Sequence, residues 1–160
     1  AVLLDAQEQR GVGEDRGILH SGIRSDGQYA PLLGVNGGVS STQTAGVLFM
    51  AGKEIYRHAV TKMPEAVQEG LGQLGLSVDD IDWLVPHQAN MRILQGVAQK
   101  LEMDSQNIVS TVEMHANTSA ASIPLALHIA SQARRIRKRQ LVACPALGAG
   151  LTWGCTILRW

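Results

Sequence analysis

Residues 83–93 read WLVPHQANMRI, and this stretch decides the fold. Its first three residues form a short apolar run, typical of a buried strand, which ends at Pro86. A helix pattern follows at once, with apolar residues recurring every three to four positions from Ile93 to Leu101. We therefore expect a strand to deliver His87 to its carboxyl end. That is the edge at which open α/β sheets bind ligands.

The same alternation of strand and helix patterns runs through the rest of the chain. Apolar residues at helical spacing predict a helix over 52–74, which Pro64 is expected to interrupt or to restart. Residues 119–133 are apolar nearly all round, which predicts a helix buried on all sides. Further strands are expected at 1–5, 18–24, 108–112, 140–146 and 151–158. Strands that alternate with helices indicate an α/β fold.

The composition fits one globular domain and excludes several classes of protein. The chain has 160 residues, 45% of them hydrophobic, with 14 basic and 14 acidic side chains. That hydrophobic content excludes a disordered chain, and no apolar run is long enough for a transmembrane helix. Zero net charge gives no bulk attraction to nucleic acid or to an anionic membrane, so we expect neither as a partner. Two Cys residues make no disulfide framework, which favours a reducing, cytoplasmic setting.

A basic cluster lies at residues 134–139, where five of six side chains are Lys or Arg. Such a cluster could mark a surface for nucleic acid or another partner. Cations at the end of a helix, however, complement its negative terminus and stay solvated. We favour the helix-end interpretation, because no other basic or aromatic residues extend the patch.

Two further segments place chemically useful groups at strand exits. His115-Ala-Asn117 lies between the strand expected at 108–112 and the next helix. Leu147 to Gly154 is a glycine-rich turn whose backbone N–H groups can approach a ligand closely. Together with His87, these loops offer an imidazole, an amide and bare backbone donors. Such donors suit the stabilisation of an oxyanion.

These motifs resemble the C-terminal half of a β-ketoacyl-acyl-carrier-protein synthase III, a condensing enzyme of the thiolase superfamily. The matching stretches are DWLVPHQANMRI, HANTSAASIPLAL, GLTWGCTILRW and MAGKEIY, and the resemblance covers nearly the whole chain. It implies a thiolase-like fold of two similar halves in α-β-α-β-α layers. Residues 1–160 would be the C-terminal half, an α/β domain with a mixed sheet and helices on both faces.

The resemblance also implies a reaction and its partners. The reaction is a decarboxylative Claisen condensation of acetyl-CoA with malonyl-acyl-carrier-protein, which initiates fatty-acid synthesis. The implied partners are the acyl carrier protein and a CoA thioester, with no cofactor beyond the substrates and no metal.

The resemblance assigns His87 and Asn117 as the catalytic pair. Both would donate hydrogen bonds to the malonyl thioester oxygen as it becomes an enolate. For His87 this requires an N–H-bearing ring whose tautomer is fixed by a neighbour. Ala149 stands where the family's glycine loop gives a backbone N–H to a second oxyanion hole. That donor survives the change from Gly to Ala only if the backbone φ stays permissive.

Two groups of residues match the family's positions for carrying the substrates. The positions that line the CoA and pantetheine tunnel are matched by Gly52, Tyr56, Ala89, Asn90 and Arg92. The positions that dock the acidic carrier protein are matched by Arg57, Gln88, Arg92 and Lys100. Arg92 and Lys100 are about two helical turns apart, so they share one face of a helix. The alternative for each cation is an ordinary solvated surface residue.

The family's nucleophilic Cys lies in the N-terminal half, and neither Cys144 nor Cys155 stands in its motif. We expect both to be small interior residues and expect no zinc site. The chain also starts without Met, in what reads as a strand already under way, which suggests a piece of a longer protein. It would then need a Cys-bearing N-terminal half, in a full enzyme that we expect to be a homodimer.

Two alternatives to this reading stay open. One is a condensing enzyme of the same superfamily that uses another starter group or makes a secondary metabolite. The other is a non-catalytic subunit that docks the carrier protein or the Cys-bearing half. The presence of both His87 and Asn117 argues against a decayed domain.

Overall fold

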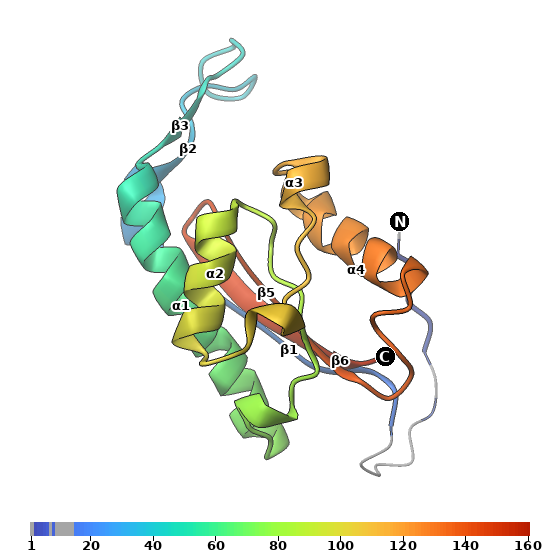
Figure 1. The fold of residues 1–160 in the computed structure, drawn as a ribbon. Coiled ribbons are helices and arrows are strands. Elements are labelled where there is room, and N and C mark those ends of the chain that lie inside the picture. The colour runs from blue at the N-terminus through green and yellow to red at the C-terminus, as the bar shows by residue number, and fades with distance from the viewer. Residues whose placement is uncertain (1, 7, 9–14) are drawn as a thin grey trace.

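A mixed four-stranded sheet forms the centre of the computed structural model, which describes residues 2–6, 8 and 15–160 (Figure 1). In spatial order its strands are β1 (Gly17–Ser25), β6 (Thr152–Arg159), β5 (Leu141–Gly148) and β4 (Trp83–Leu84). Both β1 and β5 pair with β6 in antiparallel fashion, whereas β4 and β5 are parallel. A separate hairpin projects from one end of the molecule and consists of β2 (Leu33–Val35) and β3 (Leu48–Met50).

Helices cover both faces of the sheet, as expected (Figure 1). On one face lie α1 (Gly52–Leu74) and α2 (Met91–Lys100), and on the other lies α4 (Ser122–Gln132). The four-residue α3 (Val112–His115) precedes α4. Short 3-10 helices occupy Gly27–Leu32, Val78–Asp80, Ser105–Asn107 and Ser119–Ala121. Within the part of the chain that the structure describes, no helix has the length and apolar character needed to cross a membrane.

The interior strand β5 is buried on both of its faces. Leu141, Ala143 and Leu147 belong to the core shared with α1 and α2. Val142 and Cys144 point the other way, into the core shared with α4. A strand between two helical layers needs apolar side chains in both directions, which explains its unbroken apolar sequence.

The long helix α1 runs through Pro64 without a break, so the expected interruption is wrong. Proline removes one backbone hydrogen bond from a helix interior. Met63, Val67 and Leu71 are buried against the sheet and α2, and this packing outweighs the lost bond. The helix ends at Gly75, whose φ of 67° is left-handed and whose N–H bonds back to the last turn.

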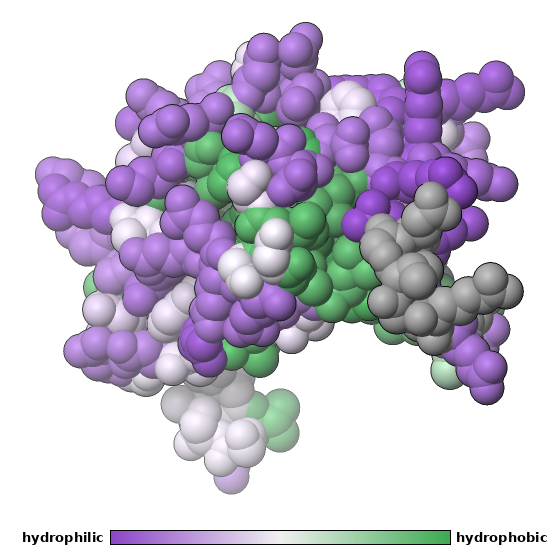
Figure 2. Space-filling view, turned by 90° about the horizontal axis from the view of Figure 1, so that it is seen from below, coloured by the Kyte–Doolittle hydropathy of each residue, from purple (hydrophilic) through white to green (hydrophobic). Residues whose placement is uncertain are grey.

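The apolar helix α4 is not buried on all sides, contrary to the expectation. Its buried residues form a single stripe of Ser122, Ala126 and Ala130, one helical turn apart. The larger Ile123 and Leu127 are only partly buried, because they border a cavity rather than a packed layer. Seen from below the view of Figure 1, hydrophobic surface lies open between polar borders (Figure 2).

Two expected strands are largely missing. Residues 108–112 contribute only a bridge between Ile108 and Leu84, because the chain turns into α3 at Val112. Residues 2–5 form no strand, and Ala1 lies outside the described residues. In the part of the chain that the structure describes, β1 is the edge of the sheet, and residues 2–5 do not pair with it.

Candidate active site

The parallel pairing with β5 carries the chain beyond β4 to His87. The N–H of Val85 donates to the Ala143 carbonyl at 2.8 Å, and the N–H of His87 donates to the Pro145 carbonyl at 2.9 Å. This ladder fixes the backbone of His87 at the carboxyl end of the sheet. His87 therefore lies where the sequence predicted it, at the end of a strand and shortly before α2.

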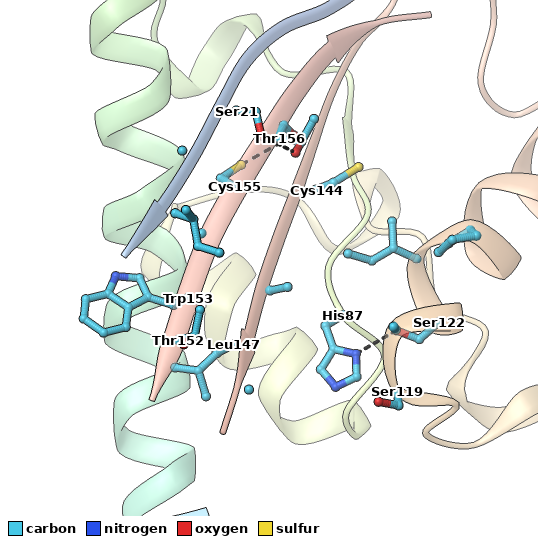
Figure 3. A pocket seen from close by; sticks show the side chains of 18 of the residues that line it. Ser21, His87, Ser119, Ser122, Cys144, Leu147, Thr152, Trp153, Cys155 and Thr156 are labelled. Atoms are coloured by element: carbon cyan, nitrogen blue, oxygen red, sulfur yellow. Dashed lines mark hydrogen bonds between the residues drawn. The ribbon is translucent and has the colours of Figure 1, made fainter. Parts of the chain in front are cut away.

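The imidazole of His87 is half-buried and forms a hydrogen bond with a side chain of α4. Its Nδ1 lies 2.7 Å from the hydroxyl oxygen of Ser122, at the start of α4 (Figure 3). Burial lowers the pKa of His87, because a charged ring loses hydration there. At neutral pH the ring is thus uncharged and carries a single N–H.

His87 opens onto a cavity of about 590 Å³ between α4 and the sheet (Figure 3). Ser119 and Ser122 lie beside the imidazole, and Ile123 and Leu127 form the helix side of the cavity. The sheet side is formed by β1, β5 and β6 and includes Ser21, Ile23, Cys144, Ala146, Leu147, Thr152, Cys155, Thr156 and Leu158. The lining is mostly apolar, with Ser119 and Ser122 beside His87 and a second polar pair, Ser21 and Thr156, farther along the sheet (Figure 3).

Asn117 lies in the short loop between α3 and the 3-10 helix that precedes α4, and its side chain is exposed. Its Oδ1 accepts a hydrogen bond of 2.9 Å from the N–H of Ser119, which itself lines the cavity. This bond uses the amide oxygen and leaves the NH2 group as the end that can donate to a ligand. Asn117 itself is not part of the cavity wall, so the chain alone brings its neighbour, rather than the amide, beside His87.

Ala149 occupies the turn between β5 and β6, where its side chain is exposed. Its φ is not positive, so the alanine side chain is accommodated without left-handed strain. The positive φ of this turn, 134°, falls on Gly150 instead. The condition for keeping a backbone donor at Ala149 is therefore met.

Gln88 is buried, with 1% of its surface exposed, so the expected docking contact with a carrier protein is wrong. Its amide NH2 donates to the carbonyls of Pro86 and Val109, at 2.8 and 3.1 Å. Its carbonyl accepts from the N–H of Thr111 at 2.8 Å. These three bonds tie the His87 loop to the segment that leads to Asn117, which makes Gln88 a structural link between two loops of the site.

The residues expected along the pantetheine tunnel lie at two helix starts. Gly52 is the first residue of α1, and Asn90 caps α2 by accepting a 3.0 Å hydrogen bond from the N–H of Ile93. Ala89 packs against the core just before that cap. The guanidinium of Arg92 lies 5.7 Å from the ring centre of Tyr56, so this pair joins the starts of the two helices.

The expected carrier-docking cations are all exposed. Arg92 and Lys100 lie on α2, and Arg57 lies on the neighbouring α1. All three are available to an acidic partner. Their role in docking stays a prediction.

Both cysteines are buried and unsuited to nucleophilic attack. Desolvation, with a smaller effect of the Cys155 thiol, raises the pKa of Cys144 far above its usual range. Burial raises the pKa of Cys155 to about 12. Because the thiolate is the reactive form, neither thiol is activated at neutral pH.

Ser122 and the linking role of Gln88 are the functional features that the sequence did not reveal. Ser122 stands inside an apolar helix pattern, where a small polar residue attracts no attention. Its one sequence signal is that it is the last hydroxyl before Pro124, at the helix start.

Comparison with known proteins gives a consistent result. The family described as "3-Oxoacyl-[acyl-carrier-protein (ACP)] synthase III C terminal" matches residues 71–160. Beta-ketoacyl-[acyl-carrier-protein] synthase III from Agrobacterium fabrum and from Paracoccus denitrificans are each 49% identical over all 160 residues. The chain spans about half the length of these curated relatives, 50% of each.

Solved structures agree with the family match. The 3-oxoacyl-(acyl carrier protein) synthase III of Pseudomonas aeruginosa superposes with a TM-score of 0.85 and 37% identity, over 95% of this chain and 47% of that one. The corresponding enzyme of Aquifex aeolicus gives a TM-score of 0.85 and 32% identity, over 93% and 46% of the two chains. These likenesses confirm the expected thiolase-like half. The chain belongs to the family of 3-oxoacyl-[acyl-carrier-protein] synthase III C-terminal domains.

Proposed function

We propose that this chain is the enolate-stabilising half of a 3-oxoacyl-[acyl-carrier-protein] synthase III. The observation that carries the proposal is the half-buried imidazole of His87, held at the end of a strand beside a mostly apolar cavity. The reading as a non-catalytic subunit is not favoured, because the similar proteins are named as synthases.

In the proposed reaction, the bond between the malonyl carboxylate and its α-carbon breaks and CO2 leaves. The electron pair moves into the thioester carbonyl and gives an enolate. An N–H of His87 and the NH2 of Asn117 donate to that oxygen as its charge develops. The enolate carbon then attacks an acyl thioester on the Cys of the other half, and the Cys thiolate leaves.

The apolar cavity supports this chemistry. Loss of CO2 moves the negative charge from the malonyl carboxylate to the enolate oxygen, and a site that excludes water strengthens each hydrogen bond to that oxygen. Ile23 is 74% exposed on the cavity wall, which fits a surface that a second domain covers. We propose that the Cys-bearing half packs there and brings its thiol towards His87.

The substrate carriers are proposed to approach over the starts of α1 and α2. Gly52, Ala89, Asn90 and the Tyr56–Arg92 pair would border the pantetheine arm, and the N–H of Ala149 would serve the second oxyanion hole. Arg57, Arg92 and Lys100 would attract the acidic carrier protein. The substrates would be acetyl-CoA and malonyl-acyl-carrier-protein, with no further cofactor, and the full enzyme would be a cytoplasmic homodimer.

The experiment removes each donor from the chain assembled with its Cys-bearing half. His87→Ala and Asn117→Ala should each slow CO2 release from malonyl thioester by about 10²–10³-fold, the usual effect of losing one oxyanion donor. Radiolabel transfer from acetyl-CoA to the Cys should persist in both variants. The combined variant should lose less than the two effects together, because the donors act on one oxygen.

His128→Ala, at an exposed position on α4, is the matched control and should leave both half-reactions unchanged. A parallel fall of CO2 release, Cys acylation and Tm would contradict the proposal, since it would mean that His87 and Asn117 only hold their loops. The 160-residue chain by itself should give no condensation product, because its thiols are not activated.

A further inference from the structure

The proposed chemistry requires an N–H on the side of His87 that faces the cavity, and the surroundings of Ser122 decide whether one is there. Ser122 is 2% exposed, and its hydroxyl oxygen has two partners in the part of the chain that the structure describes. One is the backbone N–H of Gln88, at 3.2 Å. The other is Nδ1 of His87, at 2.7 Å.

Counting protons assigns the direction of the second bond. The N–H of Gln88 can only donate, so the Ser122 oxygen accepts there. The serine then has its own O–H left to place, and His87 Nδ1 is the acceptor within reach. If Nδ1 carried the proton instead, the buried hydroxyl would lack an acceptor, which is unfavourable. The O–H therefore points at a bare Nδ1.

A neutral imidazole with a bare Nδ1 carries its proton on Nε2. The close view shows that this second nitrogen points away from Ser122 (Figure 3). His87 lines the cavity, so an Nε2–H can donate to a ligand there. The opposite tautomer would present a lone pair at that place and could not stabilise a developing oxyanion.

We propose that Ser122 is a positioning residue, which fixes His87 in the Nε2–H tautomer and holds its ring against the start of α4. The same oxygen binds the N–H of Gln88, so one hydroxyl holds both the ring and the backbone of the His87 loop. The tautomer follows from the hydrogen bonds alone, whereas its catalytic consequence rests on the proposed function.

The test compares variants that keep or remove the hydroxyl. Ser122→Thr keeps it, Ser122→Val has the same shape without it, and Ser122→Ala removes it with the least bulk. Ser131→Ala, on the same helix, is the control for the loss of a serine from α4. The Thr and Val variants share any packing strain, so a difference between them reports the hydroxyl alone.

The first readout is nitrogen NMR of the chain with ring-labelled histidine, with the His87 signals identified by their loss in His87→Ala. We expect a bare Nδ1 and a protonated Nε2 in the parent, in Ser122→Thr and in Ser131→Ala. Ser122→Ala and Ser122→Val should show a mixture of tautomers. A protonated Nδ1 in the parent, or an unchanged single tautomer in both Ala and Val variants, would overturn the inference.

The second readout is CO2 release by the assembled enzyme as a function of pH. Ser122→Val should be about 2- to 10-fold slower than Ser122→Thr, the effect of one neutral hydrogen bond. Its acidic limb should shift to higher pH, because the O–H bond to Nδ1 favours the neutral ring. A scrambled tautomer with unchanged CO2 release would uphold the positioning role of Ser122 and refute His87 as the donor.

Discussion

The two faces of the sheet differ in how completely they are packed. Against α1 and α2, side chains such as Val67, Leu84 and Ile157 have no exposed surface. Between α4 and the sheet lies a cavity of about 590 Å³, and the apolar side chain of Ile23 on its wall is 74% exposed. His87 opens onto this second face. The closed face therefore holds the domain together, whereas the open face carries His87 and is the face on which we propose that the chemistry takes place and the Cys-bearing half packs.

The largest effect is expected when a carboxylate is introduced on one face of the sheet or on the other. Val67→Asp buries a carboxylate among the apolar side chains of the closed core and should prevent folding of the chain. Ile23→Asp places the same group on the open face and should leave the circular dichroism and melting of the chain nearly unchanged. It should, however, abolish assembly with the Cys-bearing half, measured by size-exclusion chromatography. If Ile23→Asp assembles normally, the open face is not the contact surface.

The next effect concerns the link between the two loops of the site. Gln88→Leu removes three hydrogen bonds and leaves two buried carbonyls and the N–H of Thr111 without this partner. Each such loss costs about 1–3 kcal/mol, so the free energy of unfolding should fall by several kcal/mol. Thermal melting checks this, with Gln99→Leu at an exposed position of α2 as the control. Equal Tm values for both variants would show that Gln88 does not join the loops.

A smaller effect is expected at Arg92, the exposed cation near the start of α2. Arg92→Ala should raise the KM for malonyl-acyl-carrier-protein several-fold and leave acetyl transfer from CoA nearly intact. A rim cation acts mainly on the rate of encounter, so the defect should shrink as salt is added. Arg137→Ala removes an equally exposed cation beyond the end of α4 and should change neither rate. An equal loss with both substrates would indicate a role in pantetheine binding rather than carrier docking.

The sequence was informative wherever one local pattern determined the outcome. Apolar spacing located α1 and α2, and the run before Pro86 placed His87 at the end of the sheet. The errors arose where packing with distant residues decides. The composition of α4 predicted burial on all sides, but only the stripe through Ala126 meets the sheet. Likewise, the burial of Gln88 was missed because two of its three partners, on Val109 and Thr111, lie on backbone that only the fold brings near.

The smallest expected effect is the dependence of stability on pH that His87 contributes. Burial lowers its folded-state pKa below the ordinary value of 6.5, so between these two values the unfolded chain binds the extra proton. The free energy of unfolding should therefore be insensitive to His87 above pH 6.5 and should decrease as the pH falls through this window. One proton limits the slope to about 1.4 kcal/mol per pH unit. Urea unfolding at a series of pH values measures it.

His87→Gln is the matched variant, because it removes the titrating ring and keeps a polar side chain of similar size at the edge of the cavity. The difference in unfolding free energy between parent and variant should be constant above pH 6.5 and should change in favour of His87→Gln at lower pH. The two chains differ only in the ring of His87, so a pH dependence of this difference belongs to the open face. Covering that face with the Cys-bearing half should dehydrate the ring further and move the window to lower pH. A difference that is independent of pH would mean that His87 is fully hydrated and that the cavity does not exclude water from it.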